Sequence, residues 1–369
     1  MTAAPPPMAF LVGLTGLPGM GPSRLRALLA GATAEEVWRR ITAGRLEADP
    51  RWAGPAAAWT AAARDTDVAA AWSAHVEAGV GVLAHDDPSL PHALAADPEP
   101  PSVLFHLGTL AALDRPRVAI IGTRRCSHAG RSVARELGRD LAGAGVCVVS
   151  GLALGIDSAS HVGAIEAAAA SPVAVVGTGL DVVYPRQHGD LWAAVAAAGA
   201  VLSEYPLGTR PERWRFPARN RIIAALADVV VVVESHATGG SMHTVDAAIE
   251  RDRTVMAVPG PVRSSASTGT NALLAAGCPP ARDAEDVLVA LGLVGEAASR
   301  GSRPSRPEPA GPAGRVLDAV GWQPATLEEI VGRSGLGPAE VAVELVRLEA
   351  EGWLTRTGGW IERTAQGEW

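Results

Sequence analysis

The sequence predicts an α/β protein built around an open, mostly parallel β-sheet. Five short runs of small and β-branched apolar residues each stop at a glycine or at a small or polar turn; they cover residues 118–121, 146–149, 173–176, 229–233 and 254–258. Alanine-rich stretches of helical character separate most of these runs. Runs of this kind, alternating with helices, are typical of strands that are buried on both faces of a parallel sheet.

Helical, alanine-rich sequence precedes the sheet and continues to about Glu77. Pro22 suits the first position of a helix, and a stripe of leucines follows it. The turn before it, Leu17-Pro-Gly-Met-Gly21, resembles the hairpin of a helix-hairpin-helix module. We therefore expect a small helical domain of helix-hairpin-helix or SAM-like type over residues 1–77. Its hairpin could offer backbone N–H groups to a DNA phosphate, or the domain could be purely structural.

The main domain is expected over residues 78–295. Two further strands are predicted at residues 80–83 and 102–105, where they extend the sheet at one edge. In an open parallel sheet, ligands bind in the crevice outside the carboxyl ends of the strands. The turns that follow the five runs all fall at such ends, so the sequence predicts one glycine-rich edge where function is concentrated.

The ligand at this edge is expected to be anionic. Glycine lets the backbone come close to a ligand, and exposed N–H groups and helix N-termini bind phosphates. Arginines lie beside the same turns, namely Arg124, Arg125, Arg186, Arg210, Arg213, Arg215, Arg219 and Arg221. A single glycine turn would be most simply explained as a chain reversal, but five turns with interleaved arginines favour phosphate binding.

The composition limits the possible functions. The 369 residues carry a net charge of −7, so any nucleic-acid site must be a local basic patch. All 32 cationic side chains are arginine, which excludes a P-loop lysine and a Schiff-base lysine. The three cysteines and nine histidines show no metal-ligand spacing, so we expect neither a metal nor another cofactor. We find no signal peptide and no apolar run long enough for a membrane span, and we expect a cytoplasmic protein.

The C-terminal part is predicted to be a winged-helix domain behind a linker. Residues 296–313 are rich in Ser, Arg, Gly and Pro, as in an exposed linker. Residues 314–369 contain three helical segments, the second opened by the capping box Thr326-Leu-Glu-Glu329, and a hairpin that turns at Gly358-Gly359. The third helix carries four glutamates and one arginine, and this charge would repel a DNA backbone. We therefore favour protein interaction or regulation over DNA reading for this domain.

Six segments, in order, resemble the DNA-processing protein A family (DprA, also called Smf). They are Val118-Ala-Ile-Ile-Gly-Thr-Arg124, Ser150-Gly-Leu-Ala-Leu-Gly-Ile-Asp157, Gly177-Thr-Gly-Leu-Asp-Val-Val-Tyr-Pro-Arg186, Ser203-Glu-Tyr-Pro206, Phe216-Pro-Ala-Arg-Asn-Arg-Ile222, and Val258-Pro-Gly260 with Gly269-Thr-Asn271. Each segment is weak alone, and the six together are specific. The resemblance implies an extended Rossmann-like, doubly wound sheet between an N-terminal helical domain and a C-terminal winged helix.

The resemblance also implies a function. Members of the family bind single-stranded DNA, protect incoming strands during natural transformation and help load the RecA recombinase, and they have no known enzymatic activity. We therefore expect single-stranded DNA and RecA as partners, a homodimer, and no membrane span.

The expected nucleic-acid site combines the family positions with the glycine turns. It comprises Gly122, Thr123, Arg124, Gly151, Arg186, Arg219, Asn220, Arg221, Gly239, Gly240 and Ser241. Trp214 and Phe216, interleaved with arginines, could stack on bases or belong to the core. The role of His243 stays open, because many members carry an apolar residue at that position.

A nucleotide-processing enzyme is the alternative. Rossmann-like nucleotide phosphoribohydrolases of the lysine-decarboxylase-like family share glycine-rich strand ends and act on nucleoside monophosphates through a catalytic glutamate, for which Glu204 at a strand end is the candidate. Their Pro-Gly-Gly-x-Gly-Thr signature is incomplete here, because Thr238-Gly-Gly-Ser241 lacks the Gly-Thr pair. A dinucleotide dehydrogenase is disfavoured, because Gly-Thr-Arg and not Gly-x-Gly-x-x-Gly follows the first strand.

Overall fold

The structure is a computed structural model that describes residues 5–167, 170–293, 309–321 and 324–364. The chain divides into two compact units, Met1–Val294 and Gly295–Trp369, and each is described by itself. The predicted linker, residues 296–313, lies largely outside the described residues.

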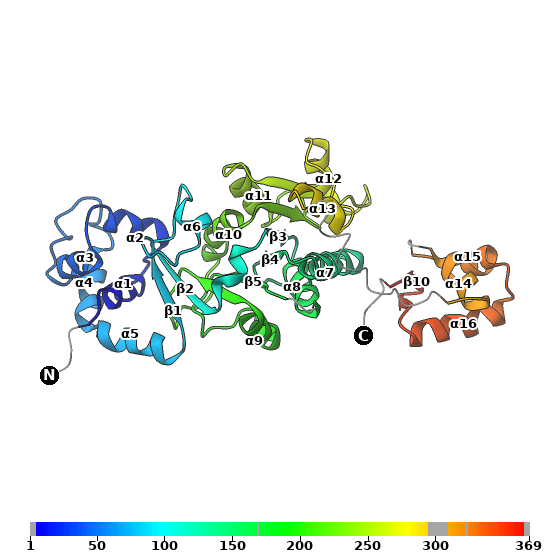
Figure 1. Cartoon of the computed structure of the whole chain (residues 1–369), viewed down its shortest axis with the longest axis horizontal. Coiled ribbons are helices and arrows are strands. Elements are labelled where there is room, and N and C mark those ends of the chain that lie inside the picture. Colours follow the sequence, from blue (N-terminus) through cyan, green and yellow to red (C-terminus); the bar gives the residue numbers. More distant parts are fainter. Residues whose placement is uncertain (1–4, 168–169, 294–308, 322–323, 365–369) are drawn as a thin grey trace. The chain divides into compact units, whose positions relative to one another are not determined.

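Five helices open the first unit (Figure 1): α1 (Pro7–Thr15), α2 (Pro22–Leu29), α3 (Ala34–Thr42), α4 (Ala56–Asp65) and α5 (Val68–Glu77). The predicted hairpin turn lies between α1 and α2, with Leu17 and Met20 buried. The fully buried Trp59 donates its Nε1–H to the carbonyl oxygen of Pro18, at 2.9 Å. The turn is thereby fixed to α4, and it forms part of the packing of the helical region.

An eight-stranded sheet follows, in the spatial order β1-β2-β6-β5-β4-β3-β7-β8. Its strands are β1 (Gly81–Ala84), β2 (Val103–Gly108), β3 (Arg117–Ile121), β4 (Cys147–Ser150), β5 (Val173–Val176), β6 (Ala200–Ser203), β7 (Val229–Val232) and β8 (Thr254–Ala257). In this spatial order, the six neighbouring strands β6-β5-β4-β3-β7-β8 are parallel to one another. At the edge beyond β6, β2 pairs antiparallel with β6 and β1 pairs antiparallel with β2. The five predicted runs and the two predicted edge strands are confirmed. β6, which was not among the runs, ends directly before Glu204.

Helices cover both faces of the sheet (Figure 1), which explains why its central strands are buried throughout. On one face, Val118 and Ile120 pack against α7 (His128–Gly143), α8 (Ile156–Glu166) and α13 (Ala284–Ala290). On the other, Ala119 and Ile121 belong to the core that includes α10 (Arg215–Leu226), α11 (Met242–Ile249) and α12 (Thr268–Ala275). The N-terminal helices and α9 (Gly189–Ala198) share a further core with β2, β5 and β6.

Short helical segments complete the first unit. They are α6 (His92–Ala95) and the 3-10 turns η1 (Leu110–Asp114), η2 (Arg186–His188) and η3 (Ser265–Ser267). Along the chain, the strands run outward from β3 to β6, and the chain then returns to β7 on the other side of β3. The strand order therefore reverses between β3 and β7, and such a switch point is where an open α/β sheet has its ligand crevice.

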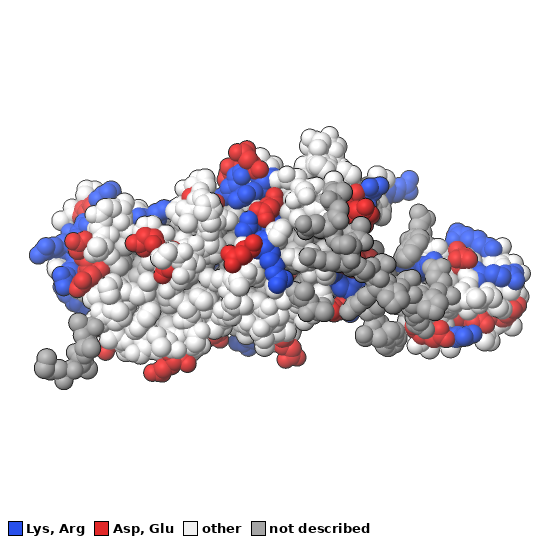
Figure 2. All heavy atoms as spheres, in the orientation of Figure 1, with Lys and Arg blue, Asp and Glu red and all other residues white. Residues whose placement is uncertain are grey.

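The second unit has the predicted winged-helix elements, α14 (Pro312–Val320), α15 (Leu327–Ser334), α16 (Pro338–Ala350), β9 (Leu354–Thr357) and β10 (Trp360–Arg363). Thr326 and Glu329 form the predicted capping box of α15. Figure 2 shows acidic side chains along α16. Arg347 pairs there with Glu344 (3.9 Å) and Glu351 (2.9 Å), so the helix has little free positive charge. Among the described residues of both units, no helix has the length and apolar character needed to cross a membrane.

Glycines allow α7 and α8 to pack closely, and this contact gives a stability prediction. A Cβ at Gly163 would lie 1.8 Å from the carbonyl oxygen of Arg135, whereas a Cβ at Gly143, at the end of α7, would meet nothing within 4 Å. We predict that Gly163→Ala lowers the free energy of unfolding by roughly 1–3 kcal/mol through overpacking. Gly143→Ala is the control and should be neutral or stabilising by up to about 1 kcal/mol. Urea unfolding measures both free energies of unfolding. Equal values for the two variants would contradict the close contact of Gly163 with α7.

Candidate nucleic-acid interface

A cleft of about 780 Å³ opens at the carboxyl ends of β3 and β7, where the strand order reverses. Its lining comes from the turn after β3, from the region around the start of α8, from α10 and the residues before it, and from the loop between β7 and α11. Four arginines and a single carboxylate line it, namely Arg124, Arg125, Arg213, Arg219 and Asp157. The cleft is therefore a basic site on an acidic protein.

The turn after β3 brings Arg124 to the cleft. Thr123 donates its backbone N–H to the carbonyl oxygen of Glu234, at 2.7 Å, which fixes the turn to the end of β7. Gly122 is required there, because a Cβ would lie 2.7 Å from the same oxygen and 2.6 Å from Ile156. Among the described residues, Arg124 has no carboxylate partner within ion-pair distance, so its guanidinium is available to an anion.

Aromatic rings support the guanidinium of Arg124. Its Cζ lies 5.1 Å from the centroid of the Phe216 ring, within the range of a cation–π contact. Phe216 in turn lies 5.3 Å from the ring of Tyr184, which is 39% exposed. The cleft thus combines a cationic fork with an accessible aromatic surface.

Glu234 occupies the N-terminus of α7. Its carboxylate accepts from the backbone N–H of Ser127 (2.8 Å) and from the Ser127 hydroxyl (2.5 Å). A Cβ at Gly130 would lie 2.3 Å from this carboxyl group. In dinucleotide-binding Rossmann proteins, the helix N-terminus after the first strand holds the pyrophosphate. Here a carboxylate lies at that place and would repel a pyrophosphate, which disfavours the dinucleotide binding mode, as the sequence does.

Arg219 lies beneath the cleft and is only 5% exposed. It donates through Nη1 to the carbonyl oxygen of Val175, and a Cβ at Gly151 would come 2.1 Å from the same Nη1. Burial lowers the pKa of Arg219 to about 10, against the effect of the nearby Asp157. Burial raises the pKa of Asp157, and Arg219 and Arg124 oppose that shift. Arg219 stays charged at neutral pH, so it contributes positive potential to the floor of the cleft.

The loop before α11 also lines the cleft. Asn220 donates its Nδ2–H to the carbonyl oxygen of Gly240, at 3.3 Å, which joins α10 to this loop. The Ser241 hydroxyl lies 2.8 Å from that of Ser235 and is buried. His243 lines the cleft and is exposed.

The structure brings most of the predicted site residues together. Eight line the cleft: Gly122, Thr123, Arg124, Arg219, Asn220, Gly239, Gly240 and Ser241. Gly151 lies against the Arg219 guanidinium, and Arg186 is exposed in η2, two residues after Tyr184. Arg221 lies elsewhere, with its guanidinium paired to the buried carboxylate of Glu204.

Several residues of this region were not predicted as site residues, among them Asp157, Tyr184 and Glu234. Asp157 and Tyr184 stand inside segments that carry the family resemblance, so their positions were available in the sequence. Glu234 ends an apolar run, and its partner Ser127 lies 107 positions earlier in the chain. No local pattern connects these two residues.

Fold and cleft together define a Rossmann-like protein with a basic, glycine-lined site for an anionic ligand. Residues 81–292 match the family model for DNA recombination-mediator protein A, and residues 300–359 match the model for the DprA winged helix domain. The chain belongs to the DNA recombination-mediator protein A family.

Relatives and solved structures agree with this membership. A relative from Mycobacterium tuberculosis, named for DNA processing, is 41% identical over 276 residues, which are 73% of this chain and 70% of the relative. DNA processing protein A from Streptococcus pneumoniae superposes with a TM-score of 0.64 at 29% identity, over 78% of this chain and 98% of that one. The protein from Helicobacter pylori, whose structure is described as showing a single-stranded DNA binding mode, has a TM-score of 0.52 at 30% identity, over 57% and 95% of the two chains.

The contact between Glu234 and α7 gives a prediction. Glu234→Ala should lower the free energy of unfolding by roughly 1–3 kcal/mol, because the N–H of Ser127 loses its buried partner. A vacated helix N-terminus attracts anions, so millimolar sulfate should raise the melting temperature of the variant more than that of the wild-type protein. Thermal unfolding with sulfate and with chloride at equal ionic strength measures this. An equal sulfate effect on both proteins would contradict the assignment.

Proposed function

We propose that the cleft binds single-stranded DNA through its sugar-phosphate backbone. The observation that carries the proposal is the guanidinium of Arg124, which has no carboxylate partner among the described residues and lies over Phe216 at the strand-order switch, beside glycine-rich turns. Arginine forks and backbone N–H groups are suited to phosphate oxygens. The structure of the relative from Helicobacter pylori, which is described with a single-stranded DNA binding mode, supports this ligand.

The aromatic side chains of the cleft favour a single strand over a duplex. Bases of a single strand are free to stack on aromatic rings and guanidinium planes, whereas duplex bases stack on each other. We propose that Phe216 and Tyr184 receive a base in this way. Trp214 differs, because its indole packs near Gly21 and the Arg215 guanidinium, so we propose a structural role for it.

The biological role that we propose follows the family. The protein would protect incoming single strands during natural transformation and help load RecA, as a homodimer in the cytoplasm. The acidic α16 supports protein interaction or regulation, in place of DNA reading, for the C-terminal unit.

We propose that the protein is not an enzyme. Glu204, the candidate catalytic residue of a phosphoribohydrolase, has a side chain that is 5% exposed and paired with Arg221. Burial raises the pKa of the Cys126 thiol, which disfavours the nucleophilic thiolate. Release of free base from a nucleoside monophosphate, abolished by Glu204→Gln, would contradict this part of the proposal.

Arg124→Ala tests the proposed contact. We expect it to weaken single-strand binding by roughly 1–3 kcal/mol, the range of a charge-assisted bond. The loss should be similar for all base sequences, because a phosphate contact carries no base information. Arg124→Lys should also lose affinity, because a point charge does not replace a planar fork. Fluorescence anisotropy with oligonucleotides of several sequences measures these effects.

The matched control for Arg124 is Arg282→Ala, which removes a surface arginine whose only ion-pair partner among the described residues is Asp286, four positions along the chain. It should bind as the wild-type protein does. Wild-type affinity in a folded Arg124→Ala variant would refute the assignment of the cleft.

Removal of the C-terminal unit gives a separate prediction. A chain that ends at Leu293 contains the whole cleft, so it should keep most of its single-strand affinity. Anisotropy titration of the shortened and complete chains at the same salt measures this. Loss of binding by a folded, monodisperse shortened chain would place the main DNA site in the C-terminal unit.

A further inference from the structure

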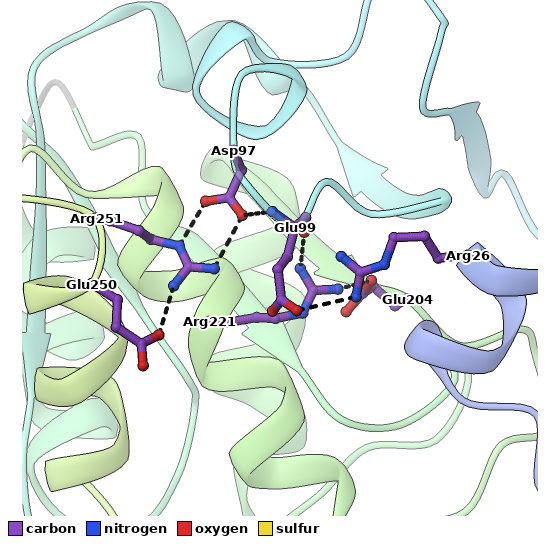
Figure 3. A network of polar contacts seen from close by, with 7 residues as sticks. All are labelled: Arg26, Asp97, Glu99, Glu204, Arg221, Glu250 and Arg251. Atoms are coloured by element: carbon purple, nitrogen blue, oxygen red, sulfur yellow. Dashed lines mark hydrogen bonds and ion pairs between the residues drawn. The ribbon is translucent and has the colours of Figure 1, made fainter. Parts of the chain in front are cut away.

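Two arginines, one in α10 and one just after α11, hold one short segment, Asp97–Glu99, between α6 and β2 (Figure 3). Arg251, two residues after α11, makes a bidentate pair with Asp97, with Nε–Oδ2 at 2.6 Å and Nη2–Oδ1 at 3.0 Å. Arg221, in the middle of α10, donates through Nη1 to the carbonyl oxygen of Glu99, at 2.6 Å, and pairs through Nη2 with Glu204. The Glu99 N–H donates to Asp97 at 2.8 Å, which closes the segment on itself.

The two ion pairs are buried, and the segment is stiff. The side chains of Arg251 and Asp97 are 6% and 3% exposed, and those of Arg221 and Glu204 are 12% and 5% exposed. Prolines at positions 98, 100 and 101 fix the backbone around Glu99. Buried ion pairs cost desolvation and persist only with good geometry and full hydrogen bonding, so they hold one arrangement and disfavour others.

The helices α10 and α11, to which these arginines are attached, carry part of the lining of the cleft. α10 supplies Phe216, Arg219 and Asn220. The loop before α11 and its first turn supply Gly239, Gly240, Ser241, His243 and Thr244. Inside the cleft, α10 is joined to the loop before α11 by the hydrogen bond from Asn220 to Gly240, which is 3.3 Å long. A further attachment, made by the buried ion pairs of Arg221 and Arg251, lies at Asp97–Glu99, outside the residues that line the cleft.

The N-terminal helices reach the same segment more weakly. Arg26 of α2 lies 3.5 Å from the carboxylate of Glu99, and the two side chains are 32% and 54% exposed. Exposed pairs of this kind contribute little, so α10 and α11 hold the segment, and α2 only touches it.

We propose that Asp97–Glu99, Arg221 and Arg251 form a clamp that sets the spacing of α10 and α11 for single-stranded DNA, without contact to the DNA. Arg221, which the sequence suggested as a phosphate contact, is then a positioning residue that acts through Glu99 and Glu204. This inference rests on the proposed function and names further residues on which it depends.

Salt dependence separates a positioning residue from a phosphate contact. The full chain carrying Asp97→Asn, Arg251→Gln or Arg221→Gln is titrated with a fluorescent deoxythymidine oligonucleotide at several salt concentrations. Each clamp variant should lose about 2- to 30-fold in affinity, the range seen for coupling through a protein. The slope of log K against log salt should stay at the wild-type value. Arg124→Ala should reduce the slope by about 0.7, because one phosphate contact is removed.

Two further measurements guard against simple misfolding. Hydrogen exchange without DNA should show faster exchange in the first turns of α10 and α11 in the Asp97→Asn variant, and unchanged exchange in α7. The double variant Asp97→Asn with Arg251→Gln should lose no more affinity than the worse single variant, because both changes break the same pair. Arg282→Ala, which alters a surface pair, is the control and should change neither quantity.

The outcomes distinguish the two proposals. A slope reduced by Arg221→Gln as much as by Arg124→Ala would make Arg221 a phosphate contact and overturn its role in the clamp. Weakened binding in Arg124→Ala, with wild-type affinity in Asp97→Asn and Arg251→Gln, would overturn the clamp and leave the proposed function standing. A wild-type protein that fails to bind the oligonucleotide would overturn the proposed function and the clamp with it.

Discussion

The reversal of strand order between β3 and β7 is the constraint on which the rest of the site depends. The chain leaves the ends of these neighbouring strands toward opposite faces of the sheet, with α7 on one face and α11 on the other. A crevice therefore remains between the two connections. The bond from Thr123 to Glu234 holds its base together, and Gly122 gives the two turns the space to meet.

Within this crevice, charge decides what binds. The carboxylate of Glu234 accepts from Ser127 at the N-terminus of α7, so it lies where other Rossmann-like proteins hold a pyrophosphate. Positive charge comes instead from arginines on the turn after β3 and on α10. In a protein without lysine, arginine forks are the permanently charged side chains that can bind phosphate, and such groups suit a chain of phosphates joined by sugars.

The sequence predicted the sheet well because its strands are buried on both faces and stand out as apolar runs. It also predicted Gly122, Thr123 and Arg124 at the cleft, since the end of the first strand of such a sheet is a fixed place in the fold. Arg219 and Arg221 show the limit of this reasoning. They lie two positions apart on one helix and therefore point about 160° apart around its axis, so one reaches the cleft floor and the other the Glu204 carboxylate. The pair of Arg251 with Asp97 joins residues 154 positions apart, and no periodicity indicates it.

Binding of a single strand and of its duplex, compared on one sequence at two salt concentrations, tests the central claim most directly. The account predicts tighter binding of the single strand at both concentrations, with log K falling by about 0.7 per neutralised phosphate for each unit of log salt. Equal or tighter binding of the blunt duplex at the same salt would contradict it, because a cleft that receives unstacked bases between Arg124, Phe216 and Tyr184 has no advantage for a paired strand.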